Sequence, residues 1–275
     1  MSHTPDLDAY FARIGYAGSR EPTRAVLDAI IFAHVSRVPF ENLDVLLGRP
    51  IELAPAAVEQ KLVRDRRGGY CFEQNGYFLE VLRALAFEVR PLSARVRIGR
   101  AREFTPARTH VFVHVTIDGV PLLADVGVGA LSPTASLRFD VEGEQATPHE
   151  PRRLVREGRW SGDMRDPRAR IFHQARLGSE WVDVAELTLE EMPEIDRVVG
   201  NWYTSAHPHS HFRGRLVVAR ATERGRVTIA DDQLTLRGAD GVGDTRKLES
   251  VEALEAALDE HFGIRLPVRA PFPPF

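Results

Sequence analysis

The sequence predicts an α+β protein with a helical first part, an antiparallel β-barrel or sandwich in the middle, and a last part that mixes helix and strand. Apolar residues recur at helical spacing up to about residue 90. From Pro91 onward, apolar and polar residues alternate between glycine turns, as they do in antiparallel strands. Short strand-like runs and one further amphipathic helix follow after residue 200. We therefore divide the chain into three units: 1–90, 91–200 and 201–275.

The composition excludes several kinds of protein. A chain of 275 residues is long enough to bury a large core, and its net charge of −3 gives no sign of a nucleic-acid partner. The single cysteine rules out an internal disulfide framework and suits a reducing compartment. The start of the chain contains Asp6 and Asp8 and is not a signal peptide, and no later run is long and apolar enough to span a membrane. We expect a cytoplasmic protein with no nucleic-acid or membrane partner; the oligomeric state does not follow from the sequence.

Four helices are predicted in the first unit. The first ends near Gly15 and the second at Pro39, because glycine and proline both stop a helix. The third covers 56–63, and the fourth begins at Cys71. The segment 39–44 contains one aromatic and two acidic residues and is predicted as a turn.

Short strands are predicted in the other two units. Apolar residues alternate along 111–117, and Asp118-Gly119 is a hairpin signal. The predicted strands of the middle unit cover 94–99, 109–117, 121–126, 152–157, 171–177 and 180–184. The segment 187–199 is predicted as a helix that Pro193 interrupts. The last unit is predicted to contain strands over 216–219, 226–229 and 233–236 and a final helix over 251–262.

Cys71 is the only cysteine in the chain, and its neighbourhood suits a nucleophile. Gly68 and Gly69 precede it, and the fourth predicted helix follows it. The first N–H groups of a helix have no partner within the helix, and that end carries partial positive charge. A thiol placed there ionises more easily, and the thiolate is the nucleophile. The other interpretation is a small buried apolar residue, and Cys71 alone does not decide between the two.

A base and an orienting acid follow on the next two predicted strands. His110 lies near the start of the strand over 109–117, and Asp125 lies near the end of the strand over 121–126. A thiolate nucleophile needs a base, and the base needs a third group to orient it. Cys71, His110 and Asp125 therefore form a workable Cys-His-Asp triad, in which Cys71 and His110 are expected to pair as thiolate and imidazolium.

Several separate motifs follow one another along the chain. They are Arg-Ile-Gly-Tyr at 13–16, Val-Pro-Phe-Glu-Asn-Leu-Asp at 38–44, Arg-Gly-Gly-Tyr-Cys-Phe-Glu-Gln-Asn at 67–75, Thr-His at 109–110, Asp-Val-Gly-Val-Gly at 125–129 and the segment 201–212. In this order they make the chain resemble the arylamine N-acetyltransferases along most of its length. The resemblance implies a helical first domain, a β-barrel second domain and an α/β lid as the third, around a thiol-protease-like Cys-His-Asp core.

The resemblance also implies an activity. Acetyl-coenzyme A would donate its acetyl group to Cys71, and an aromatic amine or hydrazine would then accept it, in ping-pong order. Acetyl-coenzyme A is then a cosubstrate, and no tightly bound cofactor is implied. Two alternatives stay open. One is a different acyl transfer on the same fold, such as amide synthesis from a carrier-protein thioester. The other is a thiol hydrolase or a scaffold with an inactive triad.

Further site residues are assigned from their positions in the family motifs. Phe40 and Val128 are predicted to line the acceptor pocket, where the family often has an aromatic residue in place of Val128. Gly127 and Gly129 are predicted to let the coenzyme A pyrophosphate approach a cradle of backbone N–H groups, and Phe212 is predicted to border the coenzyme slot. Each also has a plainer interpretation, as a core residue or as part of a tight turn.

Two other sets of residues belong to the prediction. Glu41 and Arg67 are expected to form a buried ion pair that holds the Cys71 loop, with an ordinary surface pair as the alternative. His207, His209 and His211 alternate like metal ligands, but no carboxylate or cysteine is placed to complete a site. We therefore predict no metal.

Overall fold

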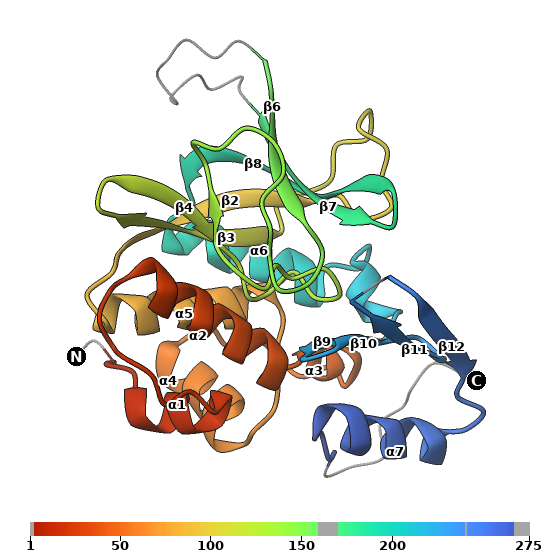
Figure 1. Cartoon of the computed structure of the whole chain (residues 1–275). Helices are drawn as coiled ribbons and strands as arrows, with labels where there is room; N and C mark the ends of the chain where they lie inside the picture. Colours follow the sequence, from red (N-terminus) through yellow and green to blue (C-terminus); the bar gives the residue numbers. More distant parts are fainter. Residues whose placement is uncertain (1–2, 159–169, 240, 267–275) are drawn as a thin grey trace.

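The chain forms two antiparallel sheets and seven α-helices over the residues that the structure describes, which are 3–158, 170–239 and 241–266. The structure is a computed structural model (Figure 1). In Figure 1 the helices of the first part lie below the larger sheet, and the smaller sheet lies to the right of these helices. None of the described helices is long and apolar enough to cross a lipid bilayer.

The four helices predicted in the first unit are present, and a fifth, short helix forms partly within the segment that was predicted as a turn. The five helices are α1 (Leu7–Ile14), α2 (Arg24–Arg37), α3 (Leu43–Leu46, the short one), α4 (Pro55–Glu59) with a π-helical turn over Gln60–Arg64, and α5 (Cys71–Ala84). Helix α1 ends at Gly15, whose φ of 68° is a left-handed conformation that glycine adopts easily. Helix α2 begins after Thr23, whose side chain accepts a hydrogen bond from the Val26 N–H. The apolar faces of these helices form one buried cluster that extends onto the larger sheet.

The larger sheet has seven strands. They are β2 (Glu88–Val96), β3 (His110–Ile117), β4 (Val120–Ala124), β5 (Leu137–Arg138), β6 (Arg152–Glu157), β7 (Arg170–Leu177) and β8 (Glu180–Glu191). Their order across the sheet is β5-β4-β3-β2-β8-β7-β6, and neighbouring strands run antiparallel. The edge strands β5 and β6 contact each other, so the sheet nearly closes on itself. Of the two predicted forms, the structure therefore has the barrel.

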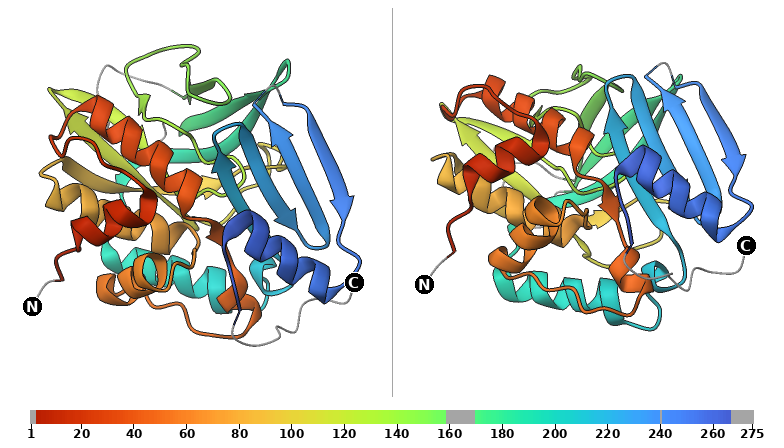
Figure 2. Two further views of the ribbon diagram at one scale, coloured as in Figure 1. Left: turned by 60° about the horizontal axis from the view of Figure 1, so that its bottom comes forward. Right: turned by 90° about the horizontal axis from the view of Figure 1, so that it is seen from below.

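The smaller sheet combines one strand from the first unit with four from the last. It consists of β1 (Phe40–Glu41), β9 (Val217–Thr222), β10 (Gly225–Ala230), β11 (Gln233–Gly238) and β12 (Gly243–Lys247), in that order. Phe40 pairs with Ala219, so the predicted turn over 39–44 is in fact a short edge strand followed by α3. Helix α7 (Val251–Phe262) packs against this sheet, as Figure 2 shows.

The prediction of a helix over 187–199 is wrong before Pro193 and confirmed after it. Strand β8 continues to Glu191, and α6 (Glu194–Ala206) begins only after Pro193. The first part of the segment alternates apolar and polar residues, and Leu187 pairs with Ile171 on β7, so it fits a strand. Pro193 sits at the cap of α6, where the missing N–H of proline leaves no helical hydrogen bond unmade.

The two points at which the sequence was divided fall inside regular elements. Strand β2 begins at Glu88 rather than at the predicted residue 94, and Pro91 lies within it opposite Val113. Proline has no N–H to donate, but the backbone oxygen of Pro91 accepts a hydrogen bond from the Met192 N–H at 3.0 Å. Pro91 therefore still contributes one hydrogen bond along its strand. Helix α6 continues across residue 200. The units are therefore joined by continuous secondary structure.

Three buried histidines predict a loss of stability in mild acid. Burial lowers the pKa of His34 to about 3, that of His173 to about 3 and that of His114 to about 4. In the unfolded chain these groups have a pKa of about 6.5, so the unfolded state binds more protons below that pH and stability falls as the pH falls. We expect the free energy of unfolding in urea to drop between pH 6.5 and pH 4.5, by up to about 1.4 kcal/mol per pH unit for each histidine. The exposed variant His209→Gln should follow the wild type, and a free energy independent of pH over this window would contradict the prediction.

Candidate active site

Cys71 is the first residue of α5, and it is buried. It is 4% exposed, and its Sγ donates a hydrogen bond to the Thr109 carbonyl oxygen at 3.2 Å. The glycine at position 68 is required by packing, because a Cβ there would lie 2.0 Å from the carbonyl oxygen of Pro39. The chain can therefore enter α5 directly against the end of α2, which places Cys71 beside the start of β3.

His110 and Asp125 form a buried hydrogen-bonded pair. His110 is the first residue of β3, and Asp125 directly follows the neighbouring antiparallel strand β4. The His110 Nε2 atom lies 3.1 Å from Asp125 Oδ2, and both residues have no exposed surface. The other ring nitrogen of His110, Nδ1, has no hydrogen-bond partner within the described part of the chain. Because the carboxylate requires a donor at Nε2, Nδ1 is left as a free proton acceptor.

Asn75 joins the three elements that carry these residues. It lies one helical turn after Cys71 on α5 and is completely buried. Its Nδ2 donates to Asp125 Oδ1 and to the Val111 carbonyl, both at 2.7 Å, and its Oδ1 accepts from the Val126 N–H at 2.8 Å. One amide therefore fixes α5 against β3 and against the segment after β4. The sequence contains Asn75 only as part of a motif, because its partners lie far away along the chain.

The Asp125 carboxylate is held in its charged form. Burial alone would raise the pKa of Asp125, but the charge of His110 and hydrogen bonds from His110, Asn75 and the Gly127 N–H lower it below its ordinary value. Gly127 also allows a close approach, because a Cβ there would lie 2.9 Å from the Cys71 Cα. The segment after Asp125 can therefore cross directly over the start of α5.

The surroundings of the Cys71 thiol favour its neutral form. Burial raises the pKa of Cys71 well above its ordinary value, and the charge of Asp125 raises it further, although the N–H groups of Phe72 and Cys71 act in the opposite direction. Only a protonated thiol can donate the hydrogen bond to Thr109. The thiolate–imidazolium pair stays a prediction: the Cys71 Sγ contacts the Thr109 carbonyl, and the free Nδ1 of His110 is the acceptor that such a pair would use.

Aromatic side chains surround Cys71. The apolar cluster that contains the cysteine also includes Phe40, Tyr70 and Phe72, with Phe212 packed at its edge. The ring centroids of Phe40 and Phe212 lie 6.0 Å apart. Val128 belongs to a different apolar cluster, which it forms with Leu131, Ala175 and Val184. The structure thus brings Phe40 and Phe212 to Cys71 but leaves Val128 outside that cluster.

Both N–H groups of the predicted pyrophosphate cradle already have acceptors within the protein. The Gly127 N–H donates to Asp125 Oδ1 at 2.8 Å, and the Gly129 N–H donates to Ser132 Oγ at 3.0 Å. Gly129 has a φ of 91°, and a Cβ there would come within 3.3 Å of the Phe40 ring. Close packing and a tight turn therefore account for both glycines.

A buried charged cluster fixes the loop 126–132. The Glu150 carboxylate accepts hydrogen bonds of 2.7 to 3.2 Å from three arginines, Arg152, Arg226 and Arg237, and we call these four residues the Glu150 cluster. Arg152 also donates to the Leu131 carbonyl, and Arg226 donates to the Ser132 carbonyl, each at 2.8 Å. Arg152 lies on β6 of the larger sheet and Arg226 on β10 of the smaller one. Both sheets therefore hold this loop.

A second set of buried charges holds the chain before Cys71. Arg67 Nη2 lies 2.7 Å from Glu41 Oε1, and the Glu41 side chain is 1% exposed, so the two form a buried pair rather than a surface pair. Lys61 lies 2.6 Å from Glu73 and 2.7 Å from Asp44. These contacts link β1, the π-helical turn and α5.

The histidines after α6 make ring contacts rather than an ion site. The rings of Tyr203 and His207 stack at 4.6 Å, and those of His211 and Phe212 lie 4.3 Å apart. Across the described residues, no group of three His, Cys, Asp or Glu side chains is arranged to hold a metal ion.

Known proteins match this chain over nearly its whole length. A family model described as N-acetyltransferase matches residues 23–270. The arylamine N-acetyltransferase of Mycobacterium tuberculosis is 40% identical over 265 residues, which cover 95% of this chain and 90% of that protein. The structure of the M. smegmatis arylamine N-acetyltransferase matches with a TM-score of 0.88 at 38% identity, covering 98% of this chain and 95% of that one. The Mycobacterium marinum arylamine N-acetyltransferase in complex with CoA matches with a TM-score of 0.87 at 37% identity, covering 94% and 93%. The sequence and the fold agree, and the chain belongs to the arylamine N-acetyltransferase family.

Proposed function

We propose that this chain transfers the acetyl group of acetyl-coenzyme A to the nitrogen of an aromatic amine or hydrazine through an acetyl-Cys71 intermediate. The observation that carries the proposal is the convergence of Cys71, at the start of α5, with the buried His110–Asp125 pair at the neighbouring strand ends. The relatives support it, since they are named arylamine N-acetyltransferases, and the structure of one of them contains CoA.

The first step acetylates Cys71. The thiol leaves the Thr109 carbonyl and passes its proton to Nδ1 of His110, and the thiolate sulfur attacks the thioester carbon of acetyl-coenzyme A. The Asp125 carboxylate keeps a proton on Nε2 and stabilises the imidazolium. The bond to the coenzyme A sulfur then breaks, and that sulfur takes the proton from His110 and leaves as a free thiol. One thioester replaces another, so this step needs little driving force.

The second step discharges the acetyl group. The amine nitrogen attacks the acetyl carbon, His110 takes the proton that the nitrogen loses, and the bond to the Cys71 sulfur breaks. The sulfur then regains its proton from His110. Phe40 and Phe212 offer an apolar surface for an aromatic acceptor beside the sulfur. The N–H groups of Cys71 and Phe72, at the start of α5, are the donors that we assign to the oxyanion.

Incubation with acetyl-coenzyme A alone, followed by intact-protein mass spectrometry, tests the proposal. We expect the mass to rise by one acetyl group, located on the Cys71 peptide, and to return when an arylamine is added. The acetylated amine should appear in the same amount. An adduct formed from a carrier-protein thioester but not from acetyl-coenzyme A would favour the alternative acyl transfer. Failure of both donors would contradict acyl transfer.

His110 is expected to set the pH dependence of Cys71. With His110 present, transfer of the thiol proton to Nδ1 should let iodoacetamide alkylate Cys71 at about pH 7, below the ordinary thiol pKa of about 8.5. In His110→Ala the proton acceptor is gone, and burial and the charge of Asp125 raise the pKa of the Cys71 thiol, so alkylation should become fast only above about pH 8.5. The exposed variant His209→Gln serves as the matched control. Identical pH profiles for the wild type and His110→Ala would show that His110 does not activate the thiol.

The remaining assignments are part of the same proposal. Acceptor contacts are assigned to Phe40 and Val128, coenzyme contacts to Gly127, Gly129 and Phe212, and support of the turn before Cys71 to Glu41 and Arg67. For Gly127 and Gly129, any coenzyme contact would be one of close approach, because their N–H groups are engaged elsewhere.

We also propose that the three units act as domains. Residues 1–90 would be a helical domain that carries the nucleophile, 91–200 a β-barrel domain that carries His110 and Asp125, and 201–275 an α/β lid. The thiol-protease-like core would then lie between the first two. Three apolar clusters centred on the helices, the larger sheet and the smaller sheet support this division, although the first extends onto the larger sheet and the third includes Leu43 of the first unit. Residues 267–275 of the last unit lie outside the described part of the chain. The cytoplasmic location stays a prediction from the composition.

A further inference from the structure

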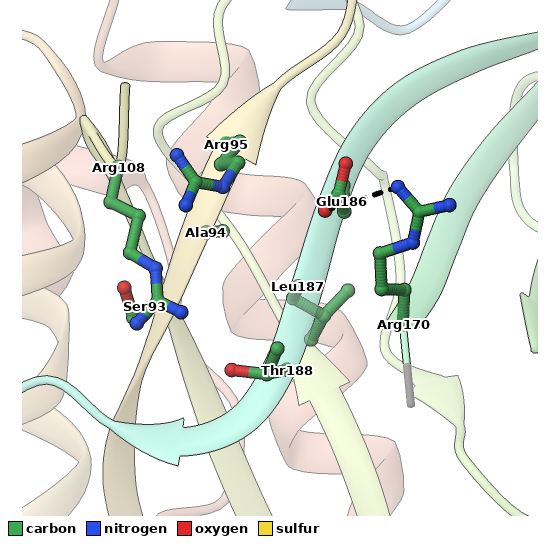
Figure 3. Close-up of a pocket in the computed structure, with 8 residues that line it drawn as sticks. All are labelled: Ser93, Ala94, Arg95, Arg108, Arg170, Glu186, Leu187 and Thr188. Atoms are coloured by element: carbon green, nitrogen blue, oxygen red, sulfur yellow. Dashed lines mark ion pairs between the residues drawn. The ribbon is translucent and has the colours of Figure 1, made fainter. Parts of the chain in front are cut away.

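Among the described residues that line a cavity on the larger sheet, three of the four charged ones are arginines. The cavity has a volume of about 210 Å³, and its charged lining consists of Arg95, Arg108, Arg170 and Glu186. Figure 3 shows the Arg95 and Arg108 side chains over β2, while Arg170 reaches Glu186 from the other side of β8. Guanidinium groups therefore outnumber carboxylates around this space.

Of the three arginines that line this cavity, Arg95 is the one without a carboxylate partner among the described residues. Its guanidinium donates to the backbone oxygen of Pro106, and within the described residues no Asp or Glu lies at ion-pair distance from it. Glu186, the acid in the cavity, is already bound by the buried Arg97, whose Nε lies 2.9 Å away. Arg108 pairs with Glu190 at the surface. Among the described residues, Arg95 therefore lines the cavity without a carboxylate in direct contact, and Glu186 offsets its charge only from a distance.

The surroundings of Arg95 make this charge costly to hold. Burial lowers the pKa of Arg95, and the charge of Arg108 lowers it further, although Glu186 acts in the opposite direction. Two guanidinium groups that are kept close together and partly out of water repel each other, and a bound anion relieves that repulsion. The hydroxyl groups of Ser93 and Thr188, which also line the cavity, supply two further donors.

We propose that this cavity binds phosphate groups. The planar fork of a guanidinium donates two parallel hydrogen bonds that match phosphate oxygens. Arg95 and Arg108 both line this space, and each has its Nη1 engaged, by the Pro106 oxygen and by Glu190 respectively, so a phosphate would bind to their remaining donors or displace Glu190. The volume equals that of roughly seven water molecules in the liquid, enough for a phosphate group with part of its water. The N–H groups of Gly127 and Gly129 are engaged by Asp125 and Ser132 and are not free for the same task.

A second cavity adjoins both this site and the surroundings of Cys71. It has a volume of about 290 Å³ and shares Ser93 and Arg108 with the first. It is also lined by Thr109, whose carbonyl accepts the Cys71 thiol, and by Met192, which packs in the apolar cluster of Cys71. The two spaces are therefore neighbours, one beside the arginines and the other beside the backbone that contacts the nucleophile.

The lining of the second cavity fits an uncharged chain and orients it. Val199, Gly200 and Tyr203 of α6 offer a mostly apolar wall, while Glu191 and Asp196 repel a phosphate group. A ligand with phosphate at one end and a neutral arm at the other would therefore place its phosphate beside Arg95. Coenzyme A has this chemistry, so the inference that the phosphates are those of coenzyme A rests on the proposed function. A free phosphate compound is the other source.

Calorimetric titration of the whole chain tests the site with three probes: sodium pyrophosphate, coenzyme A and pantetheine. Arg95→Gln removes the charge and one fork, and should weaken the binding of pyrophosphate and coenzyme A by about 10- to 100-fold while leaving pantetheine unaffected. Arg138→Gln removes the same charge from an exposed pair with Asp140 on the same sheet, outside both cavities, and should bind all three as the wild type does. Arg95→Lys should lie between the wild type and Arg95→Gln.

Arg108→Gln provides a second variant at an exposed position, which keeps the test decisive if Arg95→Gln does not fold. Weaker pyrophosphate binding with unchanged coenzyme A binding would support a site for free phosphate compounds. Unchanged binding of both probes in both variants would overturn the proposal. Acetylation of Cys71, measured in the same proteins, keeps the two questions separate. Wild type that binds pyrophosphate through Arg95 but is never acetylated would retain this site and refute the proposed function.

Discussion

Cys71→Ser is expected to lower the rate of acetylation by about a thousandfold or more. A serine hydroxyl has a far higher pKa than a thiol, and the buried position of Cys71 would raise it further. The hydroxyl can still donate to the Thr109 carbonyl, so the local geometry should survive. Intact-protein mass spectrometry after incubation with acetyl-coenzyme A measures the effect directly.

The matched control for this substitution is Cys71→Ala, which removes the sulfur without adding a hydroxyl. Both variants should keep the circular dichroism spectrum of the wild type and the affinity for coenzyme A, because neither removes a packing group larger than one atom. An acetyl adduct that forms at the wild-type rate in either variant would mean that Cys71 is not the acyl carrier.

Asp125→Asn is expected to reduce turnover by about a thousandfold or more while the fold is retained. In the wild type, Oδ1 accepts from Asn75 and from the Gly127 N–H, and Oδ2 faces His110. An asparagine has only one side-chain oxygen, and it would occupy the Oδ1 position, where Asn75 and the Gly127 N–H both donate. Its NH₂ group would then face His110. Nε2 must then accept, the ring proton moves to Nδ1, and Nδ1 can no longer take the thiol proton.

The test compares single-turnover acetylation of Asp125→Asn with that of Asp140→Asn, an exposed aspartate paired with Arg138. Asp140→Asn should behave as the wild type. The tautomer can be read independently, because the ring nitrogens of His110 differ in their ¹⁵N chemical shifts. A folded Asp125→Asn protein that acetylates Cys71 normally would remove Asp125 from the proposed mechanism.

Local signals account for the parts of the fold that the sequence predicted. The end of α1 at Gly15, the alternation along 111–117 and the Asp118-Gly119 hairpin each depend on neighbours within a few residues. Pairing between distant segments is not encoded in this way. Strand β1 exists because Phe40 meets Ala219 on β9, and a two-residue strand gives no periodicity by itself. The first part of the segment 187–199 was mispredicted because apolar residues on both sides of Pro193 imitate one helical face.

The site shows the same limit at the scale of single atoms. Residue type, order and family motifs pointed to Cys71, His110 and Asp125, and the structure brings Cys71 to the residue before His110 and His110 to Asp125. The choice of the Thr109 carbonyl as the partner of the thiol depends on a side-chain rotamer and a protonation state. Neither can be predicted from the order of the amino acids. The same is true of Asn75, whose three contacts come from three different elements.

The Glu150 cluster has a consequence for the way in which this molecule unfolds. Its arginines reach the loop 126–132 from both sheets, so opening of the smaller sheet also removes the donors that hold the loop after Asp125. If the smaller sheet were attached only by a hinge, it could open and leave the active-site residues in their positions. Because the arginines tie them together, we expect the smaller sheet and the loop to open as one cooperative unit. Partial unfolding of the last part of the chain should then abolish activity while the helices of the first part are still native.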